Sequence, residues 1–252
     1  MDYLLEGLVR IALRTARQQA PHLIQAHERP PVSRFSPKGL QEYVHQLRKR
    51  MTSAFHAMLN THFPEHKIAD ESTELEKQSG YCWFIEPLCG EENFLRSLSD
   101  YCAVIGVYHN GVAQHIVIYH YLDDSEYYAT KDEGATVNKN RLRVSNTSSL
   151  TRAVVAYSHQ DLTLDSLKYH EKIRKLVRGL RCSGCVSLDF ARVAQGKLDA
   201  CISIGPNKVI PTAASLLVSE AGGFSTAGLN NEEIFIAGNP QIFAALKTEF
   251  LD

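Results

Sequence analysis

The residues with the most chemical potential lie in one stretch, residues 83–94, Trp-Phe-Ile-Glu-Pro-Leu-Cys-Gly-Glu-Glu-Asn-Phe. Its apolar first half predicts a strand, Pro87 to Gly90 predicts a tight turn, and the last residues predict a short helix. Such a junction often builds a phosphate and metal site, because a helix N-terminus presents free N–H groups to an anion. The side chains available for chemistry there are Glu86, Cys89 and Glu91.

A phosphate and metal site could support metal-assisted phosphate hydrolysis. This reaction needs hard oxygen ligands around Mg²⁺. The thiol of Cys89 is soft and therefore a poor ligand for Mg²⁺. We expect the carboxylate of Glu91 to cap the short helix and to repel an incoming phosphate.

Helices and strands on both sides of this stretch must position it. The Asn110-Gly111 pair between two apolar runs predicts a β-hairpin. Apolar spacing and turn residues predict helices over 2–28, 40–59 and 164–177, and strands over 102–108, 112–119, 126–130 and 154–157.

Three segments resemble the inositol monophosphatase family, and closest the bacterial extragenic suppressor branch. The family signature Trp-x-Ile-Asp-Pro-x-Asp-Gly-Thr-x-Asn-Phe shares its scaffold letters with Trp83, Ile85, Pro87, Gly90, Asn93 and Phe94. Residues 181–200 and 211–223 resemble two further family segments. The resemblance implies an α/β fold, a layered α-β-α-β-α sandwich of the sugar-phosphatase type. It also implies an N-terminal sub-domain over 1–150 with an antiparallel sheet and a C-terminal α/β sub-domain over 151–252, around a cleft.

The residues that carry the catalytic and metal-binding groups of the family signature are replaced in this chain. The first aspartate corresponds to Glu86, the second to Cys89, and the catalytic threonine to Glu91. His45 stands where the resemblance places a water-activating aspartate, and Ile210 where it places a metal-binding aspartate. The metal set implied by resemblance is therefore Asp70, Glu71, Glu86, the Leu88 carbonyl and Ile210, of which Ile210 has no donor atom.

The substrate contacts implied by the resemblance have also changed. The backbone of a Gly-Ser-Ala run that contacts the sugar in the family corresponds to Gly184, Cys185 and Val186. Ser203 stands where a glutamate usually contacts inositol hydroxyls. We therefore predict a protein that has lost Mg²⁺-dependent phosphatase activity, needs no cofactor and acts by binding. The alternative is a divergent Mg²⁺-dependent phosphomonoesterase for inositol phosphate or a related sugar phosphate.

Composition limits the other classes of function. The formal net charge of -1 gives no basic field for nucleic acid, and no apolar run reaches the roughly 18 residues that span a bilayer. Six cysteines without a secretory signal indicate a reducing, cytoplasmic location. The resemblance implies a homodimer and, through its extragenic suppressor branch, a partner in the transcription machinery.

The Cys182-x-x-Cys185 motif could be a redox motif or part of a zinc site. Neither is favoured, because the motif falls in the predicted substrate segment and no further cysteine or histidine pair is spaced to complete a zinc site.

Overall fold

The computed structural model describes residues 2–69, 73–159, 164–205, 209–226 and 234–250. Asp70 and Glu71, two of the predicted metal ligands, lie outside the described residues. The chain divides into two compact units, Met1–Tyr128 (unit 1) and Ala129–Asp252 (unit 2). This division comes earlier in the chain than the sub-domain boundary expected after residue 150.

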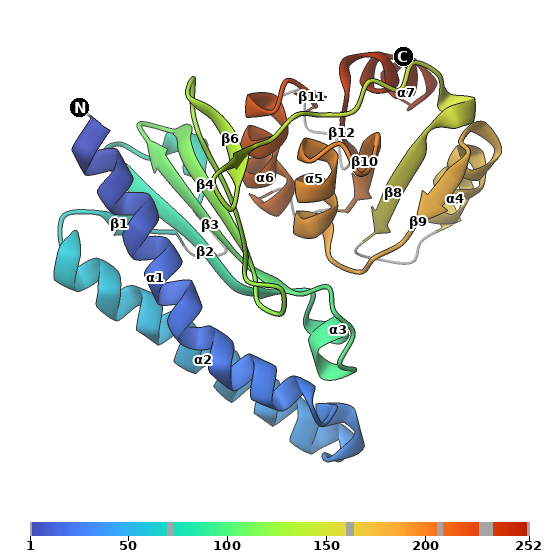
Figure 1. Ribbon diagram of the computed structural model, residues 1–252. Helices are drawn as coiled ribbons and strands as arrows, with labels where there is room; N and C mark the ends of the chain where they lie inside the picture. The colour runs from blue at the N-terminus through green and yellow to red at the C-terminus, as the bar shows by residue number, and fades with distance from the viewer. Residues whose placement is uncertain (1, 70–72, 160–163, 206–208, 227–233, 251–252) are drawn as a thin grey trace. The chain divides into compact units, whose positions relative to one another are not determined.

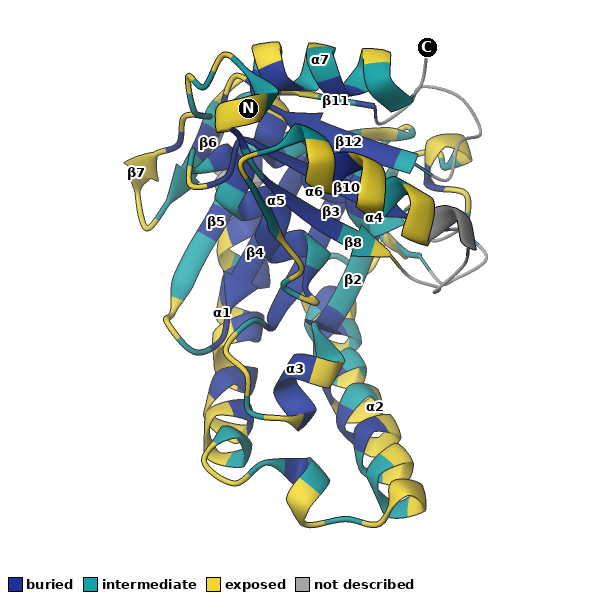
Figure 2. Ribbon diagram, turned by 90° about the vertical axis from the view of Figure 1, so that its right-hand side faces the viewer, coloured by how far each residue is buried: buried dark blue, intermediate teal, exposed yellow. Residues whose placement is uncertain are grey.

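Two long helices cover one face of the sheet in unit 1 (Figure 1): α1 (Asp2–His27) and α2 (Pro37–His62), joined through the short 3-10 helix η1 (Pro31–Ser33). Ser36 ends the connection and caps α2, because its hydroxyl oxygen accepts the Gly39 N–H at 3.3 Å. Buried residues recur every three or four positions along α2, so one side of the helix is apolar and the other exposed (Figure 2).

The strands of unit 1 follow one another across the sheet in sequence order, from β1 to β5. They are β1 (Lys67–Ile68), β2 (Tyr81–Cys89), β3 (Cys102–His109), β4 (Val112–His120) and β5 (Ser125–Thr130), with η2 (Leu75–Lys77) before β2 and α3 (Glu91–Leu95) after it. The predicted hairpin joins β3 to β4. Asn110 and Gly111 both have positive φ, of 50° and 77°, as the tight hairpin turn requires. A side chain on Gly111 would also clash with the Glu76 carbonyl.

Unit 2 begins with a hairpin of β6 (Gly134–Val137) and β7 (Asn140–Arg141), followed by η3 (Leu150–Arg152). Its main sheet has five strands in the order β11-β12-β10-β8-β9. These are β8 (Val154–His159), β9 (Gly179–Arg181), β10 (Ala200–Ile204), β11 (Phe224–Ser225) and β12 (Ile234–Gly238). The central strand β10 runs parallel to β8 and antiparallel to β12.

Helices lie on both faces of the unit 2 sheet (Figure 1). They are α4 (Leu164–Leu176), α5 (Val186–Ala194), α6 (Val209–Glu220) and α7 (Pro240–Phe250). Ile173 of α4 and Ile242 and Leu246 of α7 pack with Ile202 of β10 in one apolar cluster. The described residues thus form a mixed α/β fold with two sheets, as predicted. No helix among them is long and apolar enough to cross a membrane.

Candidate functional site

The candidate site lies at the end of β2, and here the strand differs from the prediction. β2 continues through Pro87 to Cys89, and its register with β3 shifts between Glu86 and Cys89. Pro87 is tolerated at this irregular position because it removes no regular ladder hydrogen bond there. The buried hydroxyl of Tyr121 donates to the Pro87 carbonyl at 2.7 Å. The tight turn expected over Pro87 to Gly90 is therefore wrong, and only Gly90, with φ of 83°, turns the chain into α3.

Arg48 of α2, which no sequence motif singled out, reaches this strand end. Its Nη2 donates to Oε2 of Glu86 at 2.7 Å. Its Nη1 donates to the Leu88 carbonyl at 3.2 Å and to Oε2 of Glu91 at 3.3 Å. One guanidinium therefore binds three oxygen groups of unit 1, two of which were the expected ligands of Mg²⁺.

Arg48, Glu86, the Leu88 carbonyl and Glu91 form what we call the Arg48 cluster. Burial and ion pairing act in opposite directions on the pKa values of its charged side chains. Burial raises the pKa of Glu86, while the Arg48 guanidinium and the Leu88 N–H, which donates to Oε1 at 3.0 Å, act against that rise. For Arg48, burial acts to lower the pKa, but the carboxylates of Glu86 and Glu91 outweigh burial and raise it. Arg48 is thus a permanent cation held between two acidic side chains.

Mg²⁺ does not fit the residues present at this strand end. Mg²⁺ demands oxygen ligands in near-ideal octahedral geometry, and the Arg48 guanidinium already uses oxygens of Glu86 and Leu88. Cys89 contributes a thiol in place of a carboxylate. In unit 2, Ile210 lies in the first turn of α6 and carries no donor atom.

Glu91 does not cap α3 as expected. Gly90 is the residue before the helix, and the Glu91 carboxylate accepts from Arg48. With only five residues, α3 offers a weak dipole, whereas the guanidinium offers a full charge. The stronger electrostatic partner explains the difference.

His45 and Arg48 lie one turn apart on α2, and only Arg48 contacts the strand end. The His45 side chain is exposed. Arg48 falls on the same helical face as the buried residues Val44, Met51 and Phe55. A charged residue within an apolar helical face is the signal that would have identified it, because such residues are rarely buried without a partner.

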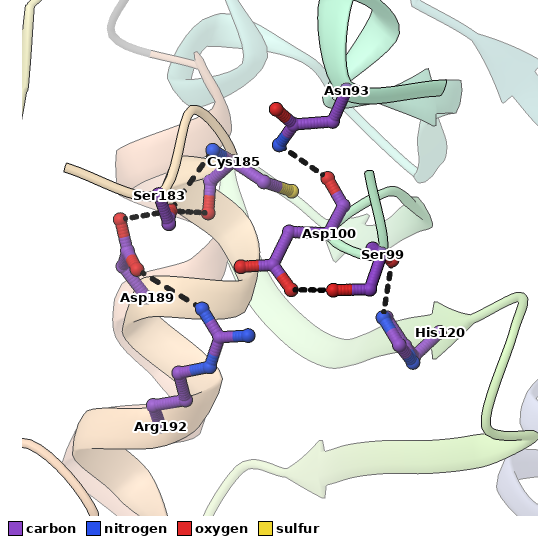
Figure 3. Close-up of polar contacts among 8 residues, drawn as sticks. All are labelled: Asn93, Ser99, Asp100, His120, Ser183, Cys185, Asp189 and Arg192. Atoms are coloured by element: carbon purple, nitrogen blue, oxygen red, sulfur yellow. Dashed lines mark hydrogen bonds and ion pairs between the residues drawn. The ribbon is translucent and has the colours of Figure 1, made fainter. Parts of the chain in front are cut away.

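The scaffold letters of the signature have structural roles that the fold explains. The fully buried Trp83 donates its indole N–H to Nδ1 of His66 at 3.0 Å. Asn93 donates to the Asp100 carbonyl at 2.8 Å and closes the turn after α3 (Figure 3). Phe94 is fully buried, edge-on to Tyr101 with ring centroids 5.4 Å apart. These residues keep the junction folded irrespective of its chemistry.

Hydrogen bonds within unit 2 already use polar groups of the predicted substrate loop. The Cys185 N–H donates to Oγ of Ser183 at 3.0 Å, and the Ser183 hydroxyl donates to Oδ2 of Asp189 at 2.8 Å (Figure 3). Gly184 has φ of 76° and lets the chain turn into α5, whose first residue is Val186. At least one backbone donor that the resemblance assigns to a sugar thus has an internal acceptor.

The remaining predicted residues are Ser203 and the cysteines of the Cys182-x-x-Cys185 motif. Ser203 is buried within β10, where it pairs in register with residues of β8 and β12. The six cysteines all lie among the described residues, and none of them forms a disulfide bond. Burial and then the Asp189 carboxylate raise the pKa of the Cys182 thiol, which disfavours the thiolate that redox catalysis requires.

The fold and the site together define a mixed α/β protein in which an arginine is hydrogen-bonded to the acidic residues at the end of a strand. Residues 4–247 match the inositol monophosphatase family, and the chain belongs to this family. The resemblance seen in the sequence is thereby confirmed.

Two relatives in sequence are called Nus factor SuhB. The chain is 31% identical to the protein of Pseudomonas aeruginosa, across 97% of this chain and 96% of that protein. It is 28% identical to the protein of Escherichia coli, with the same coverage of 97% and 96%.

Solved structures share the fold. The extragenic suppressor protein SuhB of Bartonella henselae superposes with a TM-score of 0.82 at 24% identity, over 96% of this chain and 98% of that one. The inositol monophosphatase of Anabaena gives a TM-score of 0.79 at 27% identity, over 97% and 94%. The fold class expected from the resemblance is thus confirmed.

Proposed function

We propose that this protein is a SuhB-like member of the inositol monophosphatase family that acts by binding and has lost Mg²⁺-dependent phosphatase activity. The observation that carries the proposal is the Arg48 guanidinium, bonded to Glu86, the Leu88 carbonyl and Glu91. It supplies a positive charge where the family resemblance implies a metal ion. Unlike Mg²⁺, it holds no water molecule to activate for attack on phosphorus.

The energetics favour the arginine over an added ion. An entering Mg²⁺ would be repelled by the guanidinium and would compete with it for the same oxygen lone pairs. Displacing Arg48 would break charge-assisted hydrogen bonds, the 2.7 Å contact with Glu86 among them. Cys89 and Ile210 would still leave the ion without two of its carboxylates. Because catalytic groups act as a unit, these changes together remove far more activity than any one of them.

The relatives suggest what the protein binds. The similar proteins of Pseudomonas aeruginosa and Escherichia coli are named Nus factors, and we infer that this chain likewise works with the transcription machinery. In this proposal it is a cytoplasmic homodimer that needs no cofactor. Light scattering on the purified protein tests the dimer, and a single-chain mass would contradict that part.

The first test measures Mg²⁺ binding by calorimetry and hydrolysis of inositol phosphate. We expect the unmodified protein to show neither a binding isotherm at millimolar Mg²⁺ nor Mg²⁺-dependent turnover. A variant with Arg48→Ala, Glu86→Asp, Cys89→Asp, Glu91→Thr and Ile210→Asp should gain Mg²⁺ affinity. The same variant with Arg48 retained should bind at least about tenfold more weakly, because the guanidinium remains among the ligands. Robust Mg²⁺-dependent hydrolysis by the unmodified protein would instead establish the divergent phosphomonoesterase.

A further inference from the structure

A second cationic feature of unit 1 is a cavity of about 840 Å³ between α1 and α2, near the loop that joins them. Its size falls within the roughly 300–1,000 Å³ typical of small-molecule sites. Arg29, Arg34 and Arg50 line it, together with polar side chains that include Gln25, Gln46 and Tyr43. None of these residues takes part in the Arg48 cluster.

The spacing of the lining residues shows that two helical faces turn toward this cavity. His22 and Gln25 lie three positions apart near the end of α1, and Gln46 and Arg50 lie four apart on α2. Arg29 follows α1 in the connection to α2. Farther along the pair, the same two helices present buried apolar residues such as Leu8 and Phe55. The facing surfaces of the two helices thus change from apolar to basic at this end, where Gln25, Gln46 and Arg50 are exposed to solvent.

The arginines of the cavity lack acidic partners within the described part of the chain. No described carboxylate forms an ion pair with Arg29, Arg34 or Arg50, and Glu28 is the acidic residue in the lining. Three guanidiniums and one carboxylate leave an excess of positive charge. Arg34 and Arg50 line the cavity together with Tyr43. Burial raises the pKa of Tyr43, and the positive charges of Arg34 and Arg50 act against that rise.

The loop that carries Arg29 and Arg34 is held in place before any ligand binds. Pro30 and Pro31 fix two backbone angles, and the Ser33 hydroxyl donates to the Pro30 carbonyl at 2.7 Å. The Arg34 guanidinium lies over the Phe35 ring, 5.5 Å from its centroid, and Phe35 in turn stacks on Tyr43. A site arranged in advance loses less conformational entropy when a ligand binds.

We propose that this cavity binds a small ligand carrying two or more phosphate groups. Guanidinium forks match phosphate oxygens in geometry and charge, and they stay charged at every physiological pH. Three arginines from three consecutive segments are spread over a volume larger than a single phosphate needs. Since one phosphate monoester carries a charge of about −1.5 to −2, a second phosphate allows all three arginines to be paired.

The test uses inorganic pyrophosphate as the probe, with the full-length protein in EDTA so that no metal contributes. Calorimetry should show one pyrophosphate per chain, and orthophosphate should bind about tenfold more weakly because it pairs fewer arginines. Arg34→Gln and Arg50→Gln should each weaken pyrophosphate binding about tenfold or more. The matched control is Lys49→Gln, which removes the same charge from the exposed neighbour of Arg50 and should leave the affinity unchanged.

Two results would overturn the proposal. One is the absence of pyrophosphate binding by the unmodified protein, or an equal loss in the Lys49 control, which would indicate general charge attraction. The other is tighter, Arg34-dependent binding of a single-stranded RNA lacking terminal phosphates, which would make this face a nucleic-acid surface. Arg34→Lys guards against misfolding in the neutral variants, because it keeps the charge and should weaken binding less than Arg34→Gln.

Discussion

Arg48 and the acidic residues around it show how one side chain can change the chemistry of a shared scaffold. The Glu86 side chain is only 17% exposed, so its negative charge needs a partner. The extra methylene that distinguishes glutamate from aspartate extends the carboxylate toward α2, where Arg48 lies. The presence of an arginine at residue 48 therefore accounts for a glutamate at residue 86, and the reverse also holds. Neither residue could be interpreted from its own place in the sequence.

Replacing Arg48 with methionine keeps much of its aliphatic packing but leaves Glu86 unpaired. Because the Arg48 side chain is 36% exposed, solvent reduces the penalty, and we expect a loss of about 1–3 kcal/mol in the free energy of unfolding. Adding Glu86→Gln should recover part of that loss. Urea denaturation measures both changes, with Lys49→Met as the control. Equal stability of the Arg48 and Lys49 variants would show that the pair contributes nothing.

At the scale of elements, sequence patterns predicted most helices and strands but not the path of the chain at the site. Helical spacing identified α1, α2 and α4 to within a few residues, and Asn110-Gly111 identified the β3–β4 turn. Pro87 and Gly90 favoured a tight turn, whereas β2 continues through a register shift that contacts with β3 and Tyr121 stabilise. Arg48 was missed because its partners lie about 40 residues along the chain, and the local sequence shows only its place on an apolar helical face.

The connection between α2 and β1 contains a pH-sensitive contact at His66. Nδ1 of His66 accepts the Trp83 indole N–H, so this nitrogen must be unprotonated. Burial and then His109 lower the pKa of His66 below its usual value of about 6.5. The unfolded chain therefore binds more protons between the two pKa values. His66 should contribute stability that is present above pH 6.5 and is lost as pH falls toward the folded-state pKa.

The measurement compares unfolding free energies at pH 7.5 and 5.5 for the unmodified protein and for His66→Gln. We expect the unmodified protein to lose more stability on acidification than the variant does. His45→Gln, at an exposed position, should behave like the unmodified protein. Trp83, the single tryptophan, gives an independent emission signal for the same contact. The same pH dependence in His66→Gln and the unmodified protein would contradict this role.

At the scale of the whole molecule, the family and the α/β class were predictable, and the division into units was not. Residues 129–150 belong to unit 2 because contacts distant in sequence attach them there. The Gly134 N–H donates to Glu220, and the Val144 N–H donates to the Ala221 carbonyl. The Ser145 hydroxyl donates to Asp199 at 2.6 Å. The family resemblance, on which the expected boundary rested, and the strand patterns of the sequence carry no information about such contacts.

Asn239 joins the start of unit 2 to its last helix and should be critical for stability. Its Nδ2 donates to Oγ of Ser145 at 2.8 Å and to the Thr147 carbonyl at 3.0 Å, while its Oδ1 accepts the Ile242 N–H at the start of α7. Asn239→Ala removes a helix cap and leaves buried groups unpaired, so we expect a loss of about 2–4 kcal/mol. Asn140→Ala, in exposed β7, should change stability by less than about 0.5 kcal/mol. Thermal unfolding distinguishes the two, and similar values would refute the role of Asn239.

The cation supplied by Arg48 is encoded in the gene, whereas a metal ion must be acquired from the surroundings. Its presence at the end of β2 does not depend on how much free Mg²⁺ the cell holds, or on nucleotides and chelators that sequester it. The local charge also stays constant over the physiological pH range, because arginine does not lose its proton there. A partner that recognises this part of unit 1 would therefore meet one constant surface through starvation, rapid growth and ionic stress.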